Sequence, residues 1–301
     1  MDSEYLLNKA KVRKNFEQAA NTYDASAVLQ KEIASRLLER LDYIRLQPKT
    51  VLDLGCGTGV ITADMLKRYP KADIIALDLA LNMLKKTQQN SKGRFSDSWL
   101  SASWFSDSWY SKKPSCICAD AERLPFRENA LDLLVSNLML QWSNDLQLVF
   151  NGFQRVIAPN GLLMFTTFGP DTLKEMRESW AAIDNTPHTS QFIDMHDIGD
   201  ALLKAGFSDP VMDMEVITMT YDSVRDVMKD IKNIGASNAV QGRSKGLMGK
   251  QRLKAFEIAY ERFQQVDGCF PVTWEVLYGH AWAPEGLKVE GFEKIIPIQH
   301  Q

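Results

Sequence analysis

With 301 residues, 45% of them hydrophobic, the chain has the size and composition of one main globular domain with additions. Its formal net charge of −3 gives no general attraction for nucleic acid, so any basic partner site must be local. Its most apolar window, residues 131–140, is far shorter than the roughly 18 residues of a membrane span, and its charged N-terminus is unlike a secretory signal, so we expect a cytoplasmic protein without a membrane segment.

Two helical patterns occupy residues 1–47, which we interpret as an N-terminal helical cap. Apolar residues recur at helical spacing over residues 12–23 and again over residues 29–41, with a break at residues 21–27. Two interpretations stay open. The cap covers an edge of the sheet, or residues 16–23 form a lid that excludes water from the active site, with the Tyr23 hydroxyl facing the substrate.

A glycine-rich loop follows the first predicted strand. It reads Asp53-Leu54-Gly55-Cys56-Gly57-Thr58-Gly59 and precedes an apolar-periodic stretch ending at Pro70. The three glycines let the backbone approach a ligand that any Cβ would block, and the helix start offers unpaired N–H groups. Asp53 supplies a fixed negative charge, which favours a cationic or hydroxyl-bearing ligand over a phosphate. The dinucleotide fingerprint fails because Val60 stands in place of its third glycine, and the Walker pattern also fails, whereas the loop resembles the S-adenosylmethionine loop of class I methyltransferases.

A second acidic residue lies at the end of the next predicted strand, residues 73–79. Asp78 follows Gly55 by 23 residues, close to the ~20 expected for a carboxylate that accepts from ribose hydroxyls. Taken alone, Asp78 is as well explained as a solvated residue at a strand end. Beside the glycine loop, we interpret Asp78 and Leu79 as cofactor-binding residues.

Residues 90–115 form an insert that contains a duplication. Phe95-Ser96-Asp97-Ser98-Trp99 recurs as Phe105-Ser106-Asp107-Ser108-Trp109. A contact patch made by Trp99, Trp104 and Trp109 is one interpretation. We favour a duplicated hairpin that packs on itself.

Two further predicted strands end in candidate pocket residues. One runs from Cys116 to an acid pair that includes Asp120, and the other covers residues 131–137. In the methyltransferases that the loop resembles, the aspartate contacts the adenine amino group and the N–H of the next residue, here Ala121, reaches the ring. The same resemblance places Asn137 and Gln141 near the transferred methyl group. Trp142 is either a core aromatic residue or part of the substrate site.

The cysteines and histidines show no metal-binding pattern. Cys116 and Cys118 are separated by one residue, a poor zinc spacing without a second pair, and the four histidines are scattered. We expect reduced thiols and no bound metal.

The remaining elements complete an α/β fold. A fifth strand is predicted at residues 162–168, helices at 171–182 and 195–205, a strand at 214–221 and a final strand at 271–282 that closes the sheet. The prediction is a Rossmann-like, seven-stranded, mostly parallel sheet with an antiparallel last strand, in a methyltransferase domain at residues 48–301. A helical arm, residues 223–266, precedes the last strand. Within it, residues 241–254 hold five positive charges and no acid, which fits docking to an acidic macromolecule.

Several blocks narrow the resemblance to one family. They are Phe16, Ala19-Ala20, Tyr23-Asp24, Gln30, residues 52–59, Ser136-Asn137-Leu138, Gln141-Trp142, Phe165-Thr166-Thr167, Pro187-His188, residues 233–236 and Gly242-Arg243. Over nearly the whole chain they resemble the malonyl-acyl-carrier-protein O-methyltransferases of biotin synthesis. The duplicated insert departs from that pattern.

The resemblance implies S-adenosylmethionine as cofactor and methylation of the free carboxylate of a malonyl thioester. It implies Tyr23, Gln141 and His188 as residues that orient this carboxylate, Trp142 in the substrate site, and Arg243 and Lys245 as contacts for the carrier protein. The ionised carboxylate needs no general base. A methyltransferase acting on a quinone, tRNA or protein arginine, and an assembly factor with this fold, stay open as alternatives.

Overall fold

The computed structural model describes residues 5–93, 113–243, 246 and 249–285, except the side chains of residues 92 and 93. The duplicated segments with Trp99, Trp104 and Trp109 lie outside the described residues, and so does Lys245. The interpretations of these residues therefore stay predictions.

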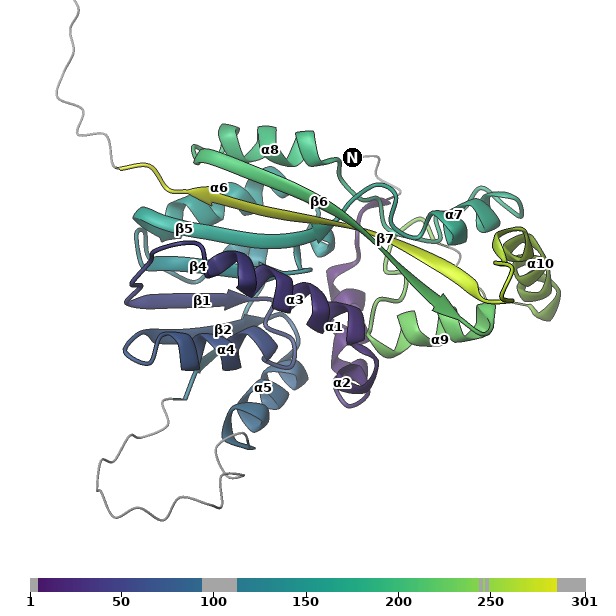
Figure 1. Ribbon diagram of the computed structural model, residues 1–301, viewed down its shortest axis with the longest axis horizontal. Coiled ribbons are helices and arrows are strands. Elements are labelled where there is room, and N and C mark those ends of the chain that lie inside the picture. The colour runs from purple at the N-terminus through teal and green to yellow at the C-terminus, as the bar shows by residue number, and fades with distance from the viewer. Residues whose placement is uncertain (1–4, 94–112, 244–245, 247–248, 286–301) are drawn as a thin grey trace, which may run out of the picture.

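One seven-stranded sheet forms the centre of the described structure (Figure 1). Its strands are β1 (Thr50–Leu54), β2 (Asp73–Asp78), β3 (Ser115–Cys118), β4 (Leu131–Asn137), β5 (Ile157–Phe168), β6 (Ser208–Tyr221) and β7 (Phe270–Trp282). They are ordered β3-β2-β1-β4-β5-β7-β6, with β1 to β5 parallel and β7 antiparallel to both neighbours. This confirms the predicted fold class. Within the antiparallel pair that follows the parallel strands, β7 lies between β5 and β6, so β6 forms one edge of the sheet and β3 forms the other.

Helices cover both faces of the sheet. They are α1 (Lys9–Ala19), α2 (Tyr23–Ser26), α3 (Val28–Leu41), α4 (Val60–Arg68), α5 (Leu81–Gly93), α6 (Leu146–Val156), α7 (Lys174–Ala181), α8 (Met195–Lys204), α9 (Val224–Asn233) and α10 (Lys250–Tyr260), with the 3-10 turns η2 (Ala121–Arg123), η3 (Leu140–Trp142) and η4 (Glu261–Phe263). Alternating strand residues divide between two cores, because successive side chains point to opposite faces. Val51 and Leu133 pack with α3 and α4, whereas Leu52 and Leu134 pack with α6 and α8.

The helices of the N-terminal cap pack in two different places, α3 on the sheet and α1 and α2 elsewhere. The apolar stripe of α3 contacts β4 and β5 within the sheet. Arg36 and Arg40 of the same helix also pair with Glu215 and Asp213 of the edge strand β6, so α3 covers part of the sheet face and reaches its edge. By contrast, α1 contacts α5, and α2 contacts α9 (Figure 1). The predicted break at residues 21–27 contains the single turn α2. Thus α1 and α2 lie between the sheet and the arm.

The arm surrounds the far halves of the two longest strands. Figure 1 shows α7, α9 and α10 gathered around the ends of β6 and β7 that extend beyond the rest of the sheet. Apolar residues of α9 and α10 join the same core as Val272 and Trp274 of β7. The arm is therefore packed on the domain through its own apolar contacts.

Two strands begin earlier than predicted. β5 starts at Ile157, and its pairing with β4 shifts register around a turn in which Asn160 has φ 62°. β6 starts at Ser208, and its first three residues, Ser208, Asp209 and Pro210, carry no hydrophobic signal. Across the described ranges, no helix combines the length and apolarity that crossing a membrane requires.

Candidate functional site

The carboxyl ends of the parallel strands form a pocket beside the glycine loop, which we call the loop pocket. Ligands of open α/β sheets bind at this edge. The expected residues that line it are Gly55, Gly57, Asp78, Leu79, Asp120, Ala121, Asn137, Tyr23 and Trp142. Lys9, Val12 and Phe16 of α1 also line it. Asp53 and Gly59 are not among its lining residues.

The three loop glycines have different roles. All have positive φ, 72° for Gly55, 54° for Gly57 and 90° for Gly59. A Cβ at Gly55 would lie 2.7 Å from Met139 Cγ, and one at Gly59 would lie 2.7 Å from Thr87 Cγ2. At Gly57 the nearest such atom is Tyr23 Cε1, at 4.0 Å. Protein packing therefore requires glycine at 55 and 59, whereas Gly57 leaves backbone open to a ligand.

Asp78 joins the end of β2 to the glycine loop. Its Oδ2 accepts from the N–H of Gly57 at 2.9 Å, and its Oδ1 accepts from the N–H of Ala80 at 2.8 Å. Burial raises the pKa of this carboxyl to about 6, although these hydrogen bonds favour the ionised form. At neutral pH Asp78 is thus a mostly ionised acceptor on the pocket wall.

Asp53 lies beneath the loop. It is 1% exposed, accepts from Thr62 Oγ1 at 2.5 Å, and lines a smaller cavity together with Tyr23 and Asn137. Burial raises its pKa to about 7. Its charge therefore depends on pH near neutrality, which differs from the fixed charge expected from the sequence.

Aromatic residues close the loop pocket from the α1 side. Phe16 packs edge-on against Trp142, with ring centroids 5.2 Å apart. Burial and the charges of Asp78 and Asp24 raise the pKa of the Tyr23 hydroxyl far above its ordinary value. Tyr23 is therefore a neutral hydrogen-bond donor at neutral pH. These positions agree with the interpretation of residues 16–23 as a lid.

A second cavity of about 400 Å³ lies between β7, α7 and the arm, and we call it the arm cavity. Apolar side chains form most of its wall, namely Phe168, Leu173, Met176, Trp180, Phe192, Met228, Ile231 and Trp274. Its polar lining includes Gln141, His188, Lys232, Arg243 and Arg252. Trp142 lines both cavities, so they adjoin at this residue.

The three residues expected to orient one substrate group are divided between these cavities. Tyr23 lines the loop pocket, whereas Gln141 and His188 line the arm cavity. The Gln141 amide donates to the carbonyl of Leu138 at 2.7 Å and accepts from Thr167 Oγ1 at 3.3 Å. Gln141 is thereby held beside Trp142, at the junction.

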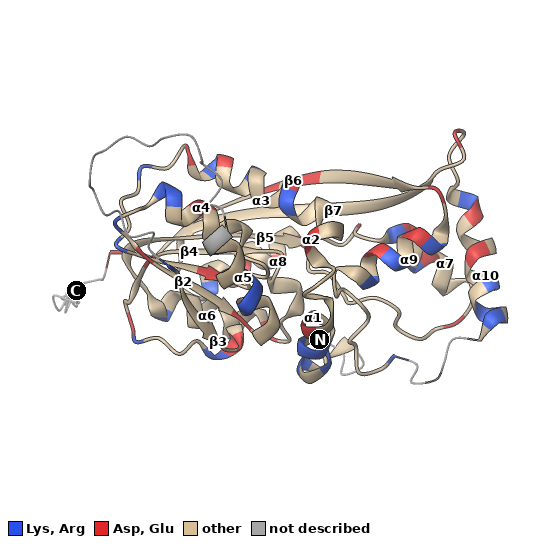
Figure 2. Cartoon of the chain, turned by 90° about the horizontal axis from the view of Figure 1, so that it is seen from below, with Lys and Arg blue, Asp and Glu red and all other residues tan. Residues whose placement is uncertain are grey.

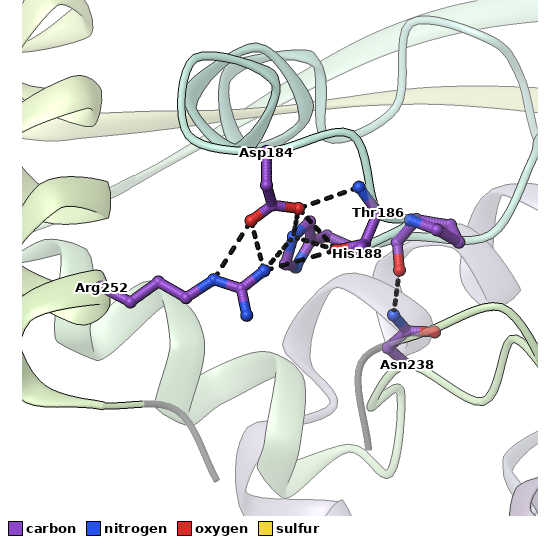
Figure 3. A network of polar contacts seen from close by, with 6 residues as sticks. Asp184, Thr186, His188, Asn238 and Arg252 are labelled. Carbon is purple, nitrogen blue, oxygen red and sulfur yellow. Dashed lines mark hydrogen bonds and ion pairs between the residues drawn. The ribbon is translucent and has the colours of Figure 1, made fainter. Parts of the chain in front are cut away.

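His188 belongs to a polar network on the arm-cavity wall (Figure 3). Its ring stacks on Trp180 with centroids 3.9 Å apart, and its Nε2 lies 3.0 Å from Asp184 Oδ1. Arg252 of α10 donates to the other oxygen of Asp184. Hydrogen bonds from Thr186, and then those from Arg252 and His188, lower the pKa of the Asp184 carboxyl. Asn238 donates to the carbonyl of Pro187 at 2.8 Å. The loop that carries His188 is thus tied to the arm.

Sequence reasoning missed several of these residues. Lys9, Trp180 and Asp184 carried no signal in the sequence, because each also depends on a partner 68 or more residues away, namely Asp120, Phe256 and Arg252. Arg252 was included only as one charge of the basic stretch. Figure 2 shows that α9 and α10 carry both signs of charge, so the arm helices are less uniformly basic than the stretch at residues 241–254. Within the described part of the chain, no group of three His, Cys, Asp or Glu residues is arranged to hold a metal ion.

Comparison with known proteins identifies the family to which this chain is similar. The family described as "Methyltransferase domain" matches residues 52–165. The malonyl-[acyl-carrier protein] O-methyltransferase of Methylovorus sp. is 49% identical over 296 residues, which cover 98% of this chain and 95% of that protein. The protein of the same name from Laribacter hongkongensis is 48% identical, with 94% of this chain and 92% of that protein covered.

Solved structures agree on the fold. The YcgJ protein of Bacillus subtilis has a TM-score of 0.56 at 13% identity, covering 83% of this chain and 98% of its own. The [4+2]-cyclase SpnF has a TM-score of 0.51 at 17% identity, covering 85% of this chain and 82% of its own. Since one of these is a cyclase, the fold alone does not determine the chemistry.

Proposed function

The chain belongs to the family of malonyl-[acyl-carrier protein] O-methyltransferases, and we propose that it transfers a methyl group from S-adenosylmethionine to the free carboxylate of a malonyl thioester, an early step of biotin synthesis. The observation that carries this proposal is the junction of two cavities at Trp142. One has a glycine loop and strand-end carboxylates. The other has apolar walls and cationic groups, which suit a long acyl arm.

The loop pocket fits the proposed cofactor. Gly57 leaves backbone accessible where a side chain would intrude, and Asp78 and Asp120 offer carboxylate oxygens to ribose hydroxyls and to the adenine amino group. The carboxylates of Asp53 and Asp78 also suit a ligand that carries positive charge. When bound, S-adenosylmethionine supplies a sulfonium methyl group, which passes to the carboxylate oxygen while the electron pair of the broken C–S bond stays on sulfur.

The protein's task in this reaction is to position the carboxylate against the methyl donor and to exclude water from both. A carboxyl with an ordinary pKa of about 4 is ionised at neutral pH, so no side chain needs to remove a proton. Gln141 and Trp142 hold the junction, Tyr23 can donate a hydrogen bond to the carboxylate, and α1 excludes water from the reacting groups. His188, farther along the arm cavity, would contact the acyl arm.

The arm is the proposed docking site for the carrier protein. Arg243, Lys232 and Arg252 line the arm cavity, and the adjoining Lys245 adds charge in the sequence. An acidic carrier protein would meet this cationic side while its acyl arm enters the apolar cavity. Oligomeric state plays no part in this proposal.

Mass spectrometry of malonyl carrier protein after incubation with the enzyme and S-adenosylmethionine tests the function. We expect one added methyl group on the malonyl moiety, and none on acetyl carrier protein, which lacks the free carboxylate. An enzyme that methylates a quinone, tRNA or protein would leave the malonyl thioester unchanged. An assembly protein would bind the cofactor and release no S-adenosylhomocysteine with any thioester.

Replacing Tyr23 by phenylalanine should slow turnover about tenfold and leave cofactor affinity within about twofold. The change removes one donor to the charged carboxylate, worth about 1.5 kcal/mol, and keeps the ring that packs in the lid. Single-turnover rates and calorimetry measure the two quantities separately. If affinity fell in parallel with the rate, Tyr23 would belong to the cofactor site.

Affinity for S-adenosylmethionine should rise with pH. Asp78 and Asp53 have pKa values raised to about 6 and about 7, and a positively charged ligand binds their ionised forms better. Protonation at lower pH therefore weakens binding, by at least about tenfold between pH 8 and pH 5. Calorimetry across this range checks the trend. In Asp53→Asn, we expect affinity to change with pH only near pH 6, where Asp78 titrates. An affinity of the wild type that did not change with pH would contradict a role of these two carboxylates in cofactor binding.

A further inference from the structure

Lys9 of α1 forms a bridge between two carboxylates at the rim of the loop pocket. Its Nζ lies 3.1 Å from Asp120 Oδ1 and 2.9 Å from Glu122 Oε1. The side chains of all three residues are partly buried, with exposed fractions of 23%, 28% and 17%. An ion pair on the open surface contributes little to stability. Lys9 and Asp120 differ from such a pair because both line the pocket.

The backbone around Lys9 is anchored on two sides. On the arm side, Leu7 forms a β-bridge with Val240, and the N–H of Asn8 donates to the carbonyl of Ala239 at 2.9 Å. On the pocket side, Asn144 accepts from the N–H of Leu7 at 2.7 Å and donates to its carbonyl at 3.2 Å. The N–H of Asn144 in turn donates to Glu122 Oε1 at 2.7 Å. Lys9 therefore has a fixed place over the carboxylates.

The contacts of Asp120 are concentrated on one oxygen. Oδ1 accepts from Lys9 Nζ and, at 3.1 Å, from the N–H of Glu122. Oδ2 has no hydrogen-bond partner among the residues that the structure describes. Two donors thus fix the carboxylate and leave the second oxygen available to a ligand in the pocket.

We propose that Lys9 is a positioning residue that presents Asp120 Oδ2 to the adenine amino group and thereby makes the site selective for adenine. This rests on the proposed cofactor. The cation also offsets the repulsion between Asp120 and the neighbouring Glu122, which would otherwise turn one carboxylate away from the other. Without Lys9, Asp120 should lose its fixed orientation while the pocket itself remains.

Selectivity between two nucleosides tests the proposal, because it depends on the amino group alone. S-inosylhomocysteine carries an oxygen where S-adenosylhomocysteine carries the amino group, and an oriented carboxylate rejects that oxygen. Both probes have a neutral sulfur, so removal of a cation changes no interaction with a sulfonium. The wild type should bind the adenosyl probe at least about 30-fold more tightly by calorimetry, a ratio that corresponds to one charge-assisted hydrogen bond.

Lys9→Met should reduce this ratio to about threefold or less, whereas Lys9→Arg, which can still bridge both carboxylates, should preserve most of it. Lys14→Met is the matched control, since Lys14 is exposed on the same helix and the change in charge is identical. A ratio that Lys9→Met leaves unchanged overturns the inference. Equal weakening of both probes also overturns it, because it would mean that Lys9 only stabilises the fold. If the wild type bound neither probe, the proposed cofactor would fail and the inference with it.

Discussion

Replacing Asp78 by alanine should lower the affinity for S-adenosylmethionine by at least about 100-fold. A buried carboxylate that accepts from two ribose hydroxyls makes hydrogen bonds worth about 1.5–3 kcal/mol each, and their loss adds to the loss of loop geometry. We expect the loss of loop geometry because Asp78 also accepts from the N–H groups of Gly57 and Ala80. Calorimetry gives the affinity directly.

The variant Asp78→Asn separates these two effects. Asparagine keeps the shape and one acceptor oxygen, yet it lacks the charge. The folded-state pKa of Asp78, about 6, lies above the ordinary value, so ionisation lowers folding stability as the pH rises from about 4 to 6 and the cost persists above that. A neutral residue avoids this cost. Asparagine keeps only one of the two backbone contacts, so we expect Asp78→Asn to lose cofactor affinity with a smaller loss of melting temperature at pH 8 than Asp78→Ala.

Asp73→Ala is the control, because Asp73 is an exposed aspartate at the other end of the same strand. Its affinity for the cofactor should match that of the wild type. Unchanged affinity in both Asp78 variants would remove the ribose role. A melting temperature that fell as much in Asp78→Asn as in Asp78→Ala would instead make the residue a structural one.

The sequence predicted the central part of the fold because the signals there are local. The parallel strands β2 and β4 are short apolar runs that end in Asp78 and Asn137. Parallel pairing, such as that of Leu54 with Leu77, brings the strand ends to one edge of the sheet. The positions of Asp78 and Asp120 at strand ends were therefore enough to place them at one site. The glycines had equally local signals, but the sequence did not distinguish Gly57 from Gly55 and Gly59, whose constraint comes from Met139 and Thr87.

The contacts of the arm could not be predicted in the same way. Trp180 stacks on Phe256, and Arg252 pairs with Asp184 across 68 positions in the chain. No periodicity or motif encodes such pairs. The place of β7 between β5 and β6 is likewise a long-range feature, because the residue pattern within a strand does not specify its neighbours in the sheet.

These contacts also change the interpretation of His188. A histidine expected to hold the reacting carboxylate is instead stacked on Trp180 and held by Asp184, with the arm attached through Asn238 (Figure 3). Gln141 lies beside Trp142 in the chain and lines the arm cavity, and Tyr23 lines the loop pocket. We therefore propose a division in which the junction residues position the reacting group and the His188 wall shapes the path of the acyl arm.

The charge reversal Arg243→Glu with Lys245→Glu should lower kcat/KM on malonyl carrier protein by about 100-fold and on malonyl-coenzyme A by about threefold or less. Arg243 lines the arm cavity, and both residues belong to a stretch of five positive charges and no acid. Reversing two charges turns attraction for an acidic protein into repulsion, which slows association and weakens the complex. A small thioester has no protein surface to repel, so it should retain most of its rate.

The comparison requires a control with the same change in net charge. Lys67→Glu with Lys204→Glu reverses two exposed residues on α4 and α8, away from the arm, and should change neither substrate's rate by more than about twofold. Higher salt should reduce the difference in kcat/KM on malonyl carrier protein between the wild type and the Arg243→Glu, Lys245→Glu variant, because salt screens exposed charges. Equal losses on both substrates would place Arg243 in the acyl-binding part of the cavity, and they would exclude the arm as a surface that recognises the carrier protein.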